Sequence, residues 1–229
     1  MIATVTKLPY QKFYFKQPLK IYESRLLRSA VLKRIEPYDV LYHNHLDDGV
    51  RMGYPLIQYK SINGKAAILY LGDGIESIHA LFSQRPGKVR VRDRVINLEI
   101  ERMESKLYRL YVTNEPLRYK IFNWIPLQNE NYLAYRRLRS DAARTEFLGR
   151  MLTGNILAFA KGVEWYVERP LELSLFRPSE MRWITYKNVK MMAFDADFAV
   201  NAILPAHIGL GKGAAHNYGV VFGGKPFNK

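Results

Sequence analysis

The sequence predicts an α+β protein with two tandem ferredoxin-like domains. The chain has 229 residues, which suits two domains of roughly 100 to 120 residues each. Its first half reads as β, α, β, β, α, β, the order of elements in the ferredoxin-like unit and in RNA-recognition modules. Its second half is a less regular copy that carries a glycine-rich loop. We expect the domains to span residues 1–113 and 114–229.

The first half begins with a strand and a helix. Residues 2–15 are rich in Val, Thr, Tyr and Phe, which favours a strand that ends before Pro18. Residues 21–35 predict a helix with one basic face, because its apolar residues are three and four positions apart. These apolar residues are Leu27, Ala30, Val31 and Ile35.

A hairpin, a helix and a fourth strand complete the first half. Strands 54–60 and 65–71 are joined by a turn containing Asn63-Gly64, a pair that readily adopts the positive φ of a tight hairpin. A helix follows at about residues 74–82. Alternating basic residues and valines then predict one strand over residues 88–100.

The second half starts at a predicted linker, Asn114-Glu115-Pro116. Residues 141–161 predict a helix with one apolar face, which includes Leu148, Leu152 and Ile156. Segments 183–186 and 189–194, rich in aromatic and β-branched residues, predict strands. The second half therefore has the elements of a second ferredoxin-like unit.

Charge and composition restrict the kind of function. The net charge is +14, so a polyanion such as nucleic acid is the expected partner. The chain has no cysteine, which rules out disulfides and thiolate metal sites and fits a cytoplasmic protein. No secretory signal pattern and no apolar run of about 18 residues occurs, so we expect no membrane span.

The glycine-rich segment, residues 209–219, reads Gly-Leu-Gly-Lys-Gly-Ala-Ala-His-Asn-Tyr-Gly. Backbone without side chains can approach phosphates closely, and a lysine adds charge; a flexible surface loop is the alternative. The segment fits neither the dinucleotide motif, which needs an acidic residue about 20 positions later, nor the P-loop, which needs Ser or Thr after the lysine. We therefore expect no cofactor.

Several blocks of the sequence resemble one protein family. Gly209-Leu210-Gly211, five residues and then Asn217-Tyr218-Gly219 are similar to the C-terminal glycine-rich loop of the CRISPR-associated RAMP endoribonucleases, which process CRISPR precursor RNA. The family usually has glycine at the position of Asn217, and asparagine tolerates a left-handed backbone. Further similar blocks are residues 54–65, 123–127, 131–132, 155–162 and 204–208.

The resemblance implies a metal-independent endoribonuclease that cleaves CRISPR repeat RNA by transesterification and leaves a 2′,3′-cyclic phosphate and a 5′-hydroxyl. It also implies a catalytic histidine after the first helix, where the sequence is Tyr42-His43-Asn44-His45. We choose His45, with His43 assisting, because both would point the same way from an extended segment.

Position and charge suggest the other site residues. Tyr54 or Tyr42 could transfer protons, and Lys33, Arg34 and Arg51 could stabilise the phosphate. The predicted RNA contacts in the loop are Gly209, Gly211, Lys212, Gly213, His216, Asn217, Tyr218 and Gly219. Two basic stretches, residues 88–94 and 136–139, are further candidate RNA tracks, with solvated surface charge as the default.

Three alternatives stay open. The chain could be a non-catalytic RAMP subunit that holds guide RNA. It could be a metal-dependent nuclease that uses His43, His45 and Asp47, although this set is short of ligands for two metals. The histidines could also be ordinary surface residues. The expected partners are CRISPR repeat RNA and an effector complex, and homodimerisation is left open.

Overall fold

The structure is a computed structural model that describes residues 5–33, 35, 45–46, 49–50, 53–82, 88–91, 94–128, 130–178 and 181–226. The chain forms two compact units, each of which is described by itself. The N-terminal unit contains Lys7–Tyr108 together with Ala215–Asn217. The C-terminal unit contains Arg109–Ala214 and the chain from Tyr218 on. The predicted boundary between residues 113 and 114 stays a prediction.

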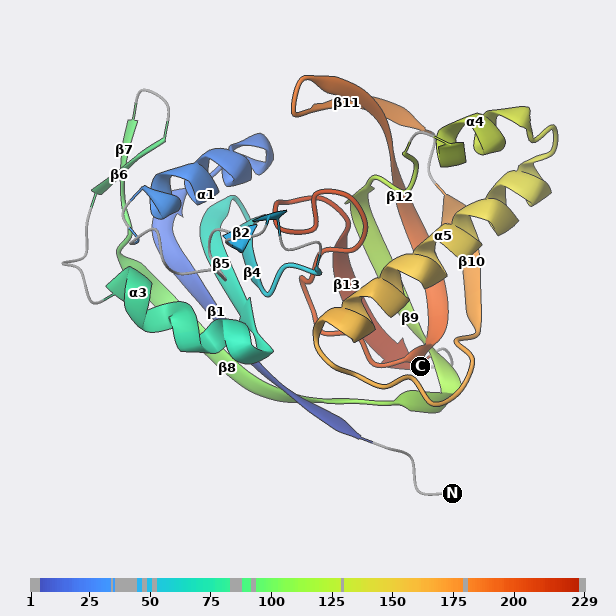
Figure 1. The fold of residues 1–229 in the computed structure, drawn as a ribbon, viewed down its shortest axis with the longest axis horizontal. Coiled ribbons are helices and arrows are strands. Elements are labelled where there is room, and N and C mark those ends of the chain that lie inside the picture. Colours follow the sequence, from blue (N-terminus) through green and yellow to red (C-terminus); the bar gives the residue numbers. More distant parts are fainter. Residues whose placement is uncertain are drawn as a thin grey trace. The chain divides into compact units, whose positions relative to one another are not determined.

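The N-terminal unit has the ferredoxin-like topology (Figure 1). Its sheet has the strand order β4-β5-β1-β8. One helical connection lies between β1 and β4 and another between β5 and β8, as the topology requires. The elements are β1 (Thr6–Pro18), the 3-10 turn η1 (Ile21–Glu23), α1 (Ser24–Leu32), β4 (Ile57–Ile62), β5 (Lys65–Leu71), the 3-10 turn η2 (Gly72–Ser77), α3 (Ile78–Phe82) and β8 (Ile100–Leu110).

Both helices of this unit pack on the same face of its sheet. Leu27 and Val31 of α1 and Leu81 of α3 share one core cluster with strand residues, among them Phe13 and Ile68. The predicted Asn-Gly hairpin is confirmed, because Asn63 and Gly64 both have positive φ, 52° and 75°. The spacing of apolar residues and the turn chemistry therefore placed these elements correctly.

The predicted single strand over residues 88–100 is wrong. The chain forms a separate two-stranded hairpin there, β6 (Lys88–Val91) paired with β7 (Arg94–Asn97), and the fourth strand of the main sheet is β8. An alternating pattern predicts extended backbone but not the sheet that the strand joins. In this hairpin the side chains of Lys88, Arg90 and Val95 are exposed.

The C-terminal unit repeats the strand order of the N-terminal one, as β10-β12-β9-β13, and α5 crosses its sheet (Figure 1). Between β12 and β13, where the N-terminal unit has its second helix, residues 203–219 form no helix and contain the glycine-rich segment. The elements are β9 (Val112–Trp124), α4 (Glu130–Arg137), α5 (Asp141–Gly162), β10 (Leu173–Pro178), β11 (Arg182–Tyr186), which pairs with β12, β12 (Val189–Ala202) and β13 (Val220–Pro226).

The predicted linker at residues 114–116 is wrong, because these residues lie inside β9. The β9–β12 pairing shifts register between Leu117, opposite Val200, and Val112, opposite Ala202. Pro116 lies in that irregular stretch, where a missing ladder N–H is tolerated.

The helix predicted over residues 141–161 is confirmed as α5. Ser140 begins it as a cap, since the Ala143 N–H donates to the Ser140 hydroxyl at 3.2 Å. Its apolar face is buried, including Leu148, Leu152 and Ile156. In the part of the chain that the structure describes, no helix is both long and apolar enough to cross a membrane.

Candidate active site and the glycine-rich segment

The segment after α1 carries the candidate catalytic histidines. His45 lies in β2 (His45–Leu46), whose backbone pairs antiparallel with β3 (Gly49–Val50) and places His45 opposite Val50. The backbone at His45 is therefore extended. Five other candidates, Arg34, Tyr42, His43, Asp47 and Arg51, lie outside the described residues. The catalytic roles of His43 and His45 stay predictions.

Tyr54 and Lys33 are described. Tyr54 is half-buried, and its hydroxyl oxygen accepts a hydrogen bond from Gln58 Nε2 at 2.9 Å. Burial raises the pKa of the Tyr54 hydroxyl well above its usual value, outweighing the hydrogen bond from Gln58, so the group is a neutral phenol at physiological pH. Lys33 is exposed at the C-terminal end of α1, where its charge can meet an anion.

The glycines of the loop are required by close packing within the C-terminal unit. A Cβ on Gly219 would lie 1.9 Å from the carbonyl oxygen of Leu210, and one on Gly211 would lie 2.8 Å from Asn155 Oδ1. Gly211, Gly213 and Gly219 also have positive φ, and a Cβ on Gly209 would lie 2.4 Å from the Ala214 carbonyl oxygen. Only glycine fits these positions without strain.

Much of the loop backbone already donates hydrogen bonds inside the protein. The Leu210 N–H donates to the Gly219 carbonyl at 2.9 Å, and the Gly219 N–H donates to the Asn123 carbonyl at 3.1 Å. The N–H groups of Lys212 and Ala214 donate to the carbonyls of Ile125 and Gly211. These donors are engaged within the fold, so binding of RNA by the predicted glycines stays a prediction.

Residues 215–217 belong to the N-terminal unit and lie along the free edge of β4. The Tyr59 N–H donates to the Ala215 carbonyl at 2.7 Å, and the Ser61 N–H donates to Asn217 Oδ1 at 3.0 Å. Strand β4 is at the end of its sheet, where backbone donors would otherwise have no ladder partner. Residues 215–217, the tip of the glycine-rich segment, therefore accept hydrogen bonds from backbone N–H groups at the edge of the sheet.

Asn217 differs from the expectation of a left-handed backbone, because it is not among the residues with positive φ. Its side chain has the structural role instead. Asn217 is buried, its Oδ1 accepts from Ser61, and its N–H donates to Ser24 Oγ at 3.2 Å. The asparagine side chain is thus explained by its hydrogen bond from Ser61, whereas the bond to Ser24 uses a backbone N–H that any residue except proline would supply.

The other predicted loop contacts are also packed within the protein. His216 is buried, with 4% of its surface exposed, and its carbonyl accepts from Lys60 Nζ at 3.0 Å. The Tyr218 ring meets the Tyr186 ring edge to face at 5.1 Å between centroids. Lys212 is half-buried, and its Nζ donates to Gln128 Oε1 at 3.2 Å. Their RNA contacts stay predictions.

Lys60 is a charged residue that is fully buried in an alternating strand. Gln58 and Lys60 alternate with Ile57 and Tyr59 in β4, a pattern that indicates a solvated face, yet both polar side chains are fully buried. Burial lowers the pKa of the Lys60 ammonium to about 7. The hydrogen bond to the His216 carbonyl, 156 positions away, explains the lysine, and local pattern carries no sign of it.

A metal site would need a group of His, Asp or Glu side chains close together in the fold. Within the described ranges, no three or more His, Asp or Glu side chains are grouped so that they could hold a metal ion. The alternative metal set includes His43 and Asp47, which are outside those ranges. The alternative of a metal-dependent nuclease therefore stays a prediction.

Comparison with known proteins identifies the family. The models of the Cas6b N-terminal and C-terminal domains match residues 6–109 and 111–223. An uncharacterized protein of Methanocaldococcus jannaschii is 30% identical over 143 residues, which cover 59% of this chain and 96% of the relative.

Solved structures share the fold over nearly the whole chain. A crystal structure of Cas6b has a TM-score of 0.87 at 23% identity, and one of a CRISPR RNA processing endoribonuclease Cas6b has a TM-score of 0.71 at 22% identity. Each comparison covers 95% of this chain and 100% of the other. With both family models matched in order, the chain belongs to the Cas6b family of CRISPR-associated proteins, in the group that processes CRISPR precursor RNA.

Proposed function

We propose that this protein is a metal-independent endoribonuclease that cleaves CRISPR repeat RNA once per repeat. The observation that carries the proposal is membership of the Cas6b family over residues 6–223, combined with the pair His43 and His45 in the segment after α1. The extended backbone at His45 is compatible with the extended segment that the pairing of the two side chains requires, and His43 lies outside the described residues. The net charge of +14 supports a polyanionic substrate.

The proposed reaction is an internal transesterification. The ribose 2′-oxygen bonds to the adjacent phosphorus as the bond from phosphorus to the 5′-oxygen breaks. A general base accepts the 2′-hydroxyl proton and a general acid protonates the departing 5′-oxygen. The products are a 2′,3′-cyclic phosphate and a 5′-hydroxyl, and no water or redox partner is consumed.

We assign the leading catalytic role to His45, because histidine can exchange a proton at neutral pH, and we assign the assisting role to His43. Tyr54 would donate rather than accept a proton, since burial keeps its hydroxyl protonated. Lys33, exposed at the end of α1, would stabilise negative charge on the phosphate together with Arg34 and Arg51.

The test uses end-labelled repeat RNA in EDTA. We expect cleavage to continue in EDTA and His45→Ala to slow it by about 10²- to 10⁴-fold, the usual contribution of a general acid or base. The matched control is His79→Ala, since His79 is exposed on α3, and its cleavage rate should be unchanged.

A 2′-deoxy substitution at the cleaved nucleotide should also stop the reaction, because it removes the nucleophile. Cleavage that requires a divalent metal would contradict the metal-independent mechanism, and unimpaired cleavage by His45→Ala would contradict the site. RNA binding without cleavage under all conditions would favour the non-catalytic guide-RNA subunit.

A further inference from the structure

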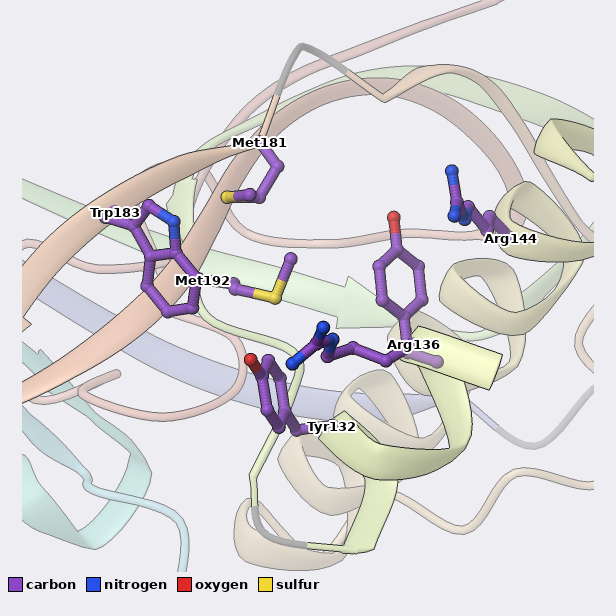
Figure 2. Close-up of a pocket in the computed structure, with 7 residues that line it drawn as sticks. Tyr132, Arg136, Arg144, Met181, Trp183 and Met192 are labelled. Carbon is purple, nitrogen blue, oxygen red and sulfur yellow. The ribbon is translucent and has the colours of Figure 1, made fainter. Parts of the chain in front are cut away.

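A groove in the C-terminal unit lies between α4 and the β11–β12 hairpin (Figure 2). Its volume is about 490 Å³, within the range of roughly 300 to 1,000 Å³ that is typical of small-molecule sites. Trp183 of β11 lies opposite Met192 of β12 in the strand register. The groove is lined by Tyr132, Tyr135, Arg136, Arg144, Met181, Trp183 and Met192.

The largest aromatic side chain of the groove, Trp183, is exposed to solvent. Trp183 is 53% exposed, although burial of an indole would be favourable. Tyr132 meets it at 6.3 Å between ring centroids and an interplanar angle of 65°, so the tyrosine touches the indole without stacking on it. Met192 is buried and lies between the two sides of the groove in Figure 2. More than half of the Trp183 surface is thus accessible to a ligand.

The charged side chains of the groove are arginines, and none of the lining residues is acidic. The Arg136 guanidinium lies 5.9 Å from the Tyr132 ring centroid, and that of Arg144 lies 5.9 Å from the Tyr135 ring centroid. The Nε of Arg144 is buried and has no hydrogen-bond partner among the described residues. Its NH1 is 3.5 Å from the carboxylate of the exposed Asp141, a weak ion pair.

We propose that this groove binds an unpaired nucleotide of RNA. The base stacks on Trp183, and Arg136 and Arg144 contact the adjacent phosphates. A flat aromatic surface beside arginines matches the two chemical parts of a nucleotide, a π-face and an anion. The groove gives a role to Arg136 of the basic stretch 136–139. Arg137 and Arg139 are exposed but do not line the groove.

The proposal rests on the proposed function for the identity of the substrate, but it requires no catalysis. It adds a binding subsite in the C-terminal unit to the candidate catalytic segment of the N-terminal unit. A nucleotide held there would fix the register of single-stranded RNA.

Tryptophan fluorescence tests the proposal directly. Trp124 and Trp165 are 0% and 3% exposed, so Trp183 is the exposed one of the three tryptophans. We expect a ten-nucleotide uridine RNA to quench the protein emission, and Trp183→Phe to abolish the quenching while it retains a ring for stacking. Anisotropy of the fluorescein-labelled RNA should give a Kd within about twofold of the original for Trp183→Phe.

Trp183→Ala should raise the Kd about tenfold, the size of effect expected for loss of one stacked base. Arg136→Ala should also weaken binding and lower the salt dependence of log Kd by about one. The matched control is Tyr166→Ala, because Tyr166 is 74% exposed but does not line the groove, and its Kd should be unchanged.

An unchanged Kd for Trp183→Ala, or no quenching at saturating RNA, would overturn the proposal. A change in sedimentation of Trp183→Ala without a change in Kd would also overturn it, in favour of a contact with a second copy of the chain. Cleavage of repeat RNA is measured in parallel. Quenching without cleavage would contradict the proposed function and support nucleotide binding in the groove. Cleavage without quenching would support the proposed function and contradict nucleotide binding in the groove.

Discussion

The two units share one strand order but differ in the connection before the last strand. In the N-terminal unit this connection contains η2, the helix α3 and the β6–β7 hairpin, and Leu81 of α3 enters the core. In the C-terminal unit residues 203–219 take this place without a helix. Internal hydrogen bonds such as those of Leu210 and Gly219 hold this connection. The comparison teaches that close backbone packing can replace a helix, provided that glycine occupies the positions where two backbone segments are in contact.

The largest expected effect is that of Gly219→Ala. Its Cβ would lie 1.9 Å from the Leu210 carbonyl oxygen, and the residue has φ +60°. Since backbone on both sides must shift, we expect the free energy of unfolding to fall by about 3 kcal/mol or more. Urea denaturation measures this loss.

Gly154→Ala is the matched control for this substitution. Gly154 lies inside α5, and apart from its chain neighbours and the backbone of its own helix no atom lies within 4 Å of an added Cβ, so alanine should stabilise the protein by about 0.5–1 kcal/mol through helix propensity. Equal effects of the two substitutions would show that the 203–219 connection is not tightly packed, and the comparison of the two units would fail.

Lys60 gives the next effect, which depends on pH. Burial lowers its pKa from the ordinary 10.5 to about 7, so between these values the unfolded state binds more protons than the folded state. Stability should therefore rise with pH from 7 to 9.5 and fall as pH drops toward 7, by about 1 kcal/mol per pH unit. Lys60→Met should flatten this slope and stabilise the protein most at pH 7.

Thermal unfolding across this pH range checks the prediction, with Lys7→Met as the control because Lys7 is exposed in the same unit. The control should keep the slope of the unchanged protein. A slope that survives in Lys60→Met would mean that Lys60 is not the buried group responsible for the pH dependence.

Periodicity and turn chemistry predicted most of the fold. The helix α5 and the Asn63-Gly64 hairpin follow from local sequence, because their apolar spacing and their positive φ are set by neighbours in the chain. The β6–β7 hairpin and the strand through Pro116 did not follow. Their pairing partners are chosen by tertiary packing, and an alternating or proline-containing segment does not specify them.

The site was predicted less fully than the fold. The resemblance of whole blocks indicated the family, and the catalytic role of the histidine segment stays a prediction. The roles of Lys60 and Asn217 depend on hydrogen bonds between residues 156 positions apart. The groove was missed for the same reason. Tyr132 and Trp183 come from elements about 50 positions apart in the chain, and they meet only in the folded unit.

The smallest of these effects is expected for Asn217→Ala, which tests whether the tip of the connection holds the edge of β4. The substitution leaves the Ser61 N–H without its acceptor, and the loss should be about 1–2 kcal/mol of unfolding free energy. Asn131→Ala, an exposed position on α4, should change stability by less than about 0.5 kcal/mol. If the two variants unfold at the same urea concentration, Asn217 does not secure the edge, and the main-chain bond from Tyr59 to Ala215 must suffice. The backbone of residues 215–217, through the 2.7 Å hydrogen bond between the Tyr59 N–H and the Ala215 carbonyl, would then take the place of a neighbouring strand without help from the asparagine side chain.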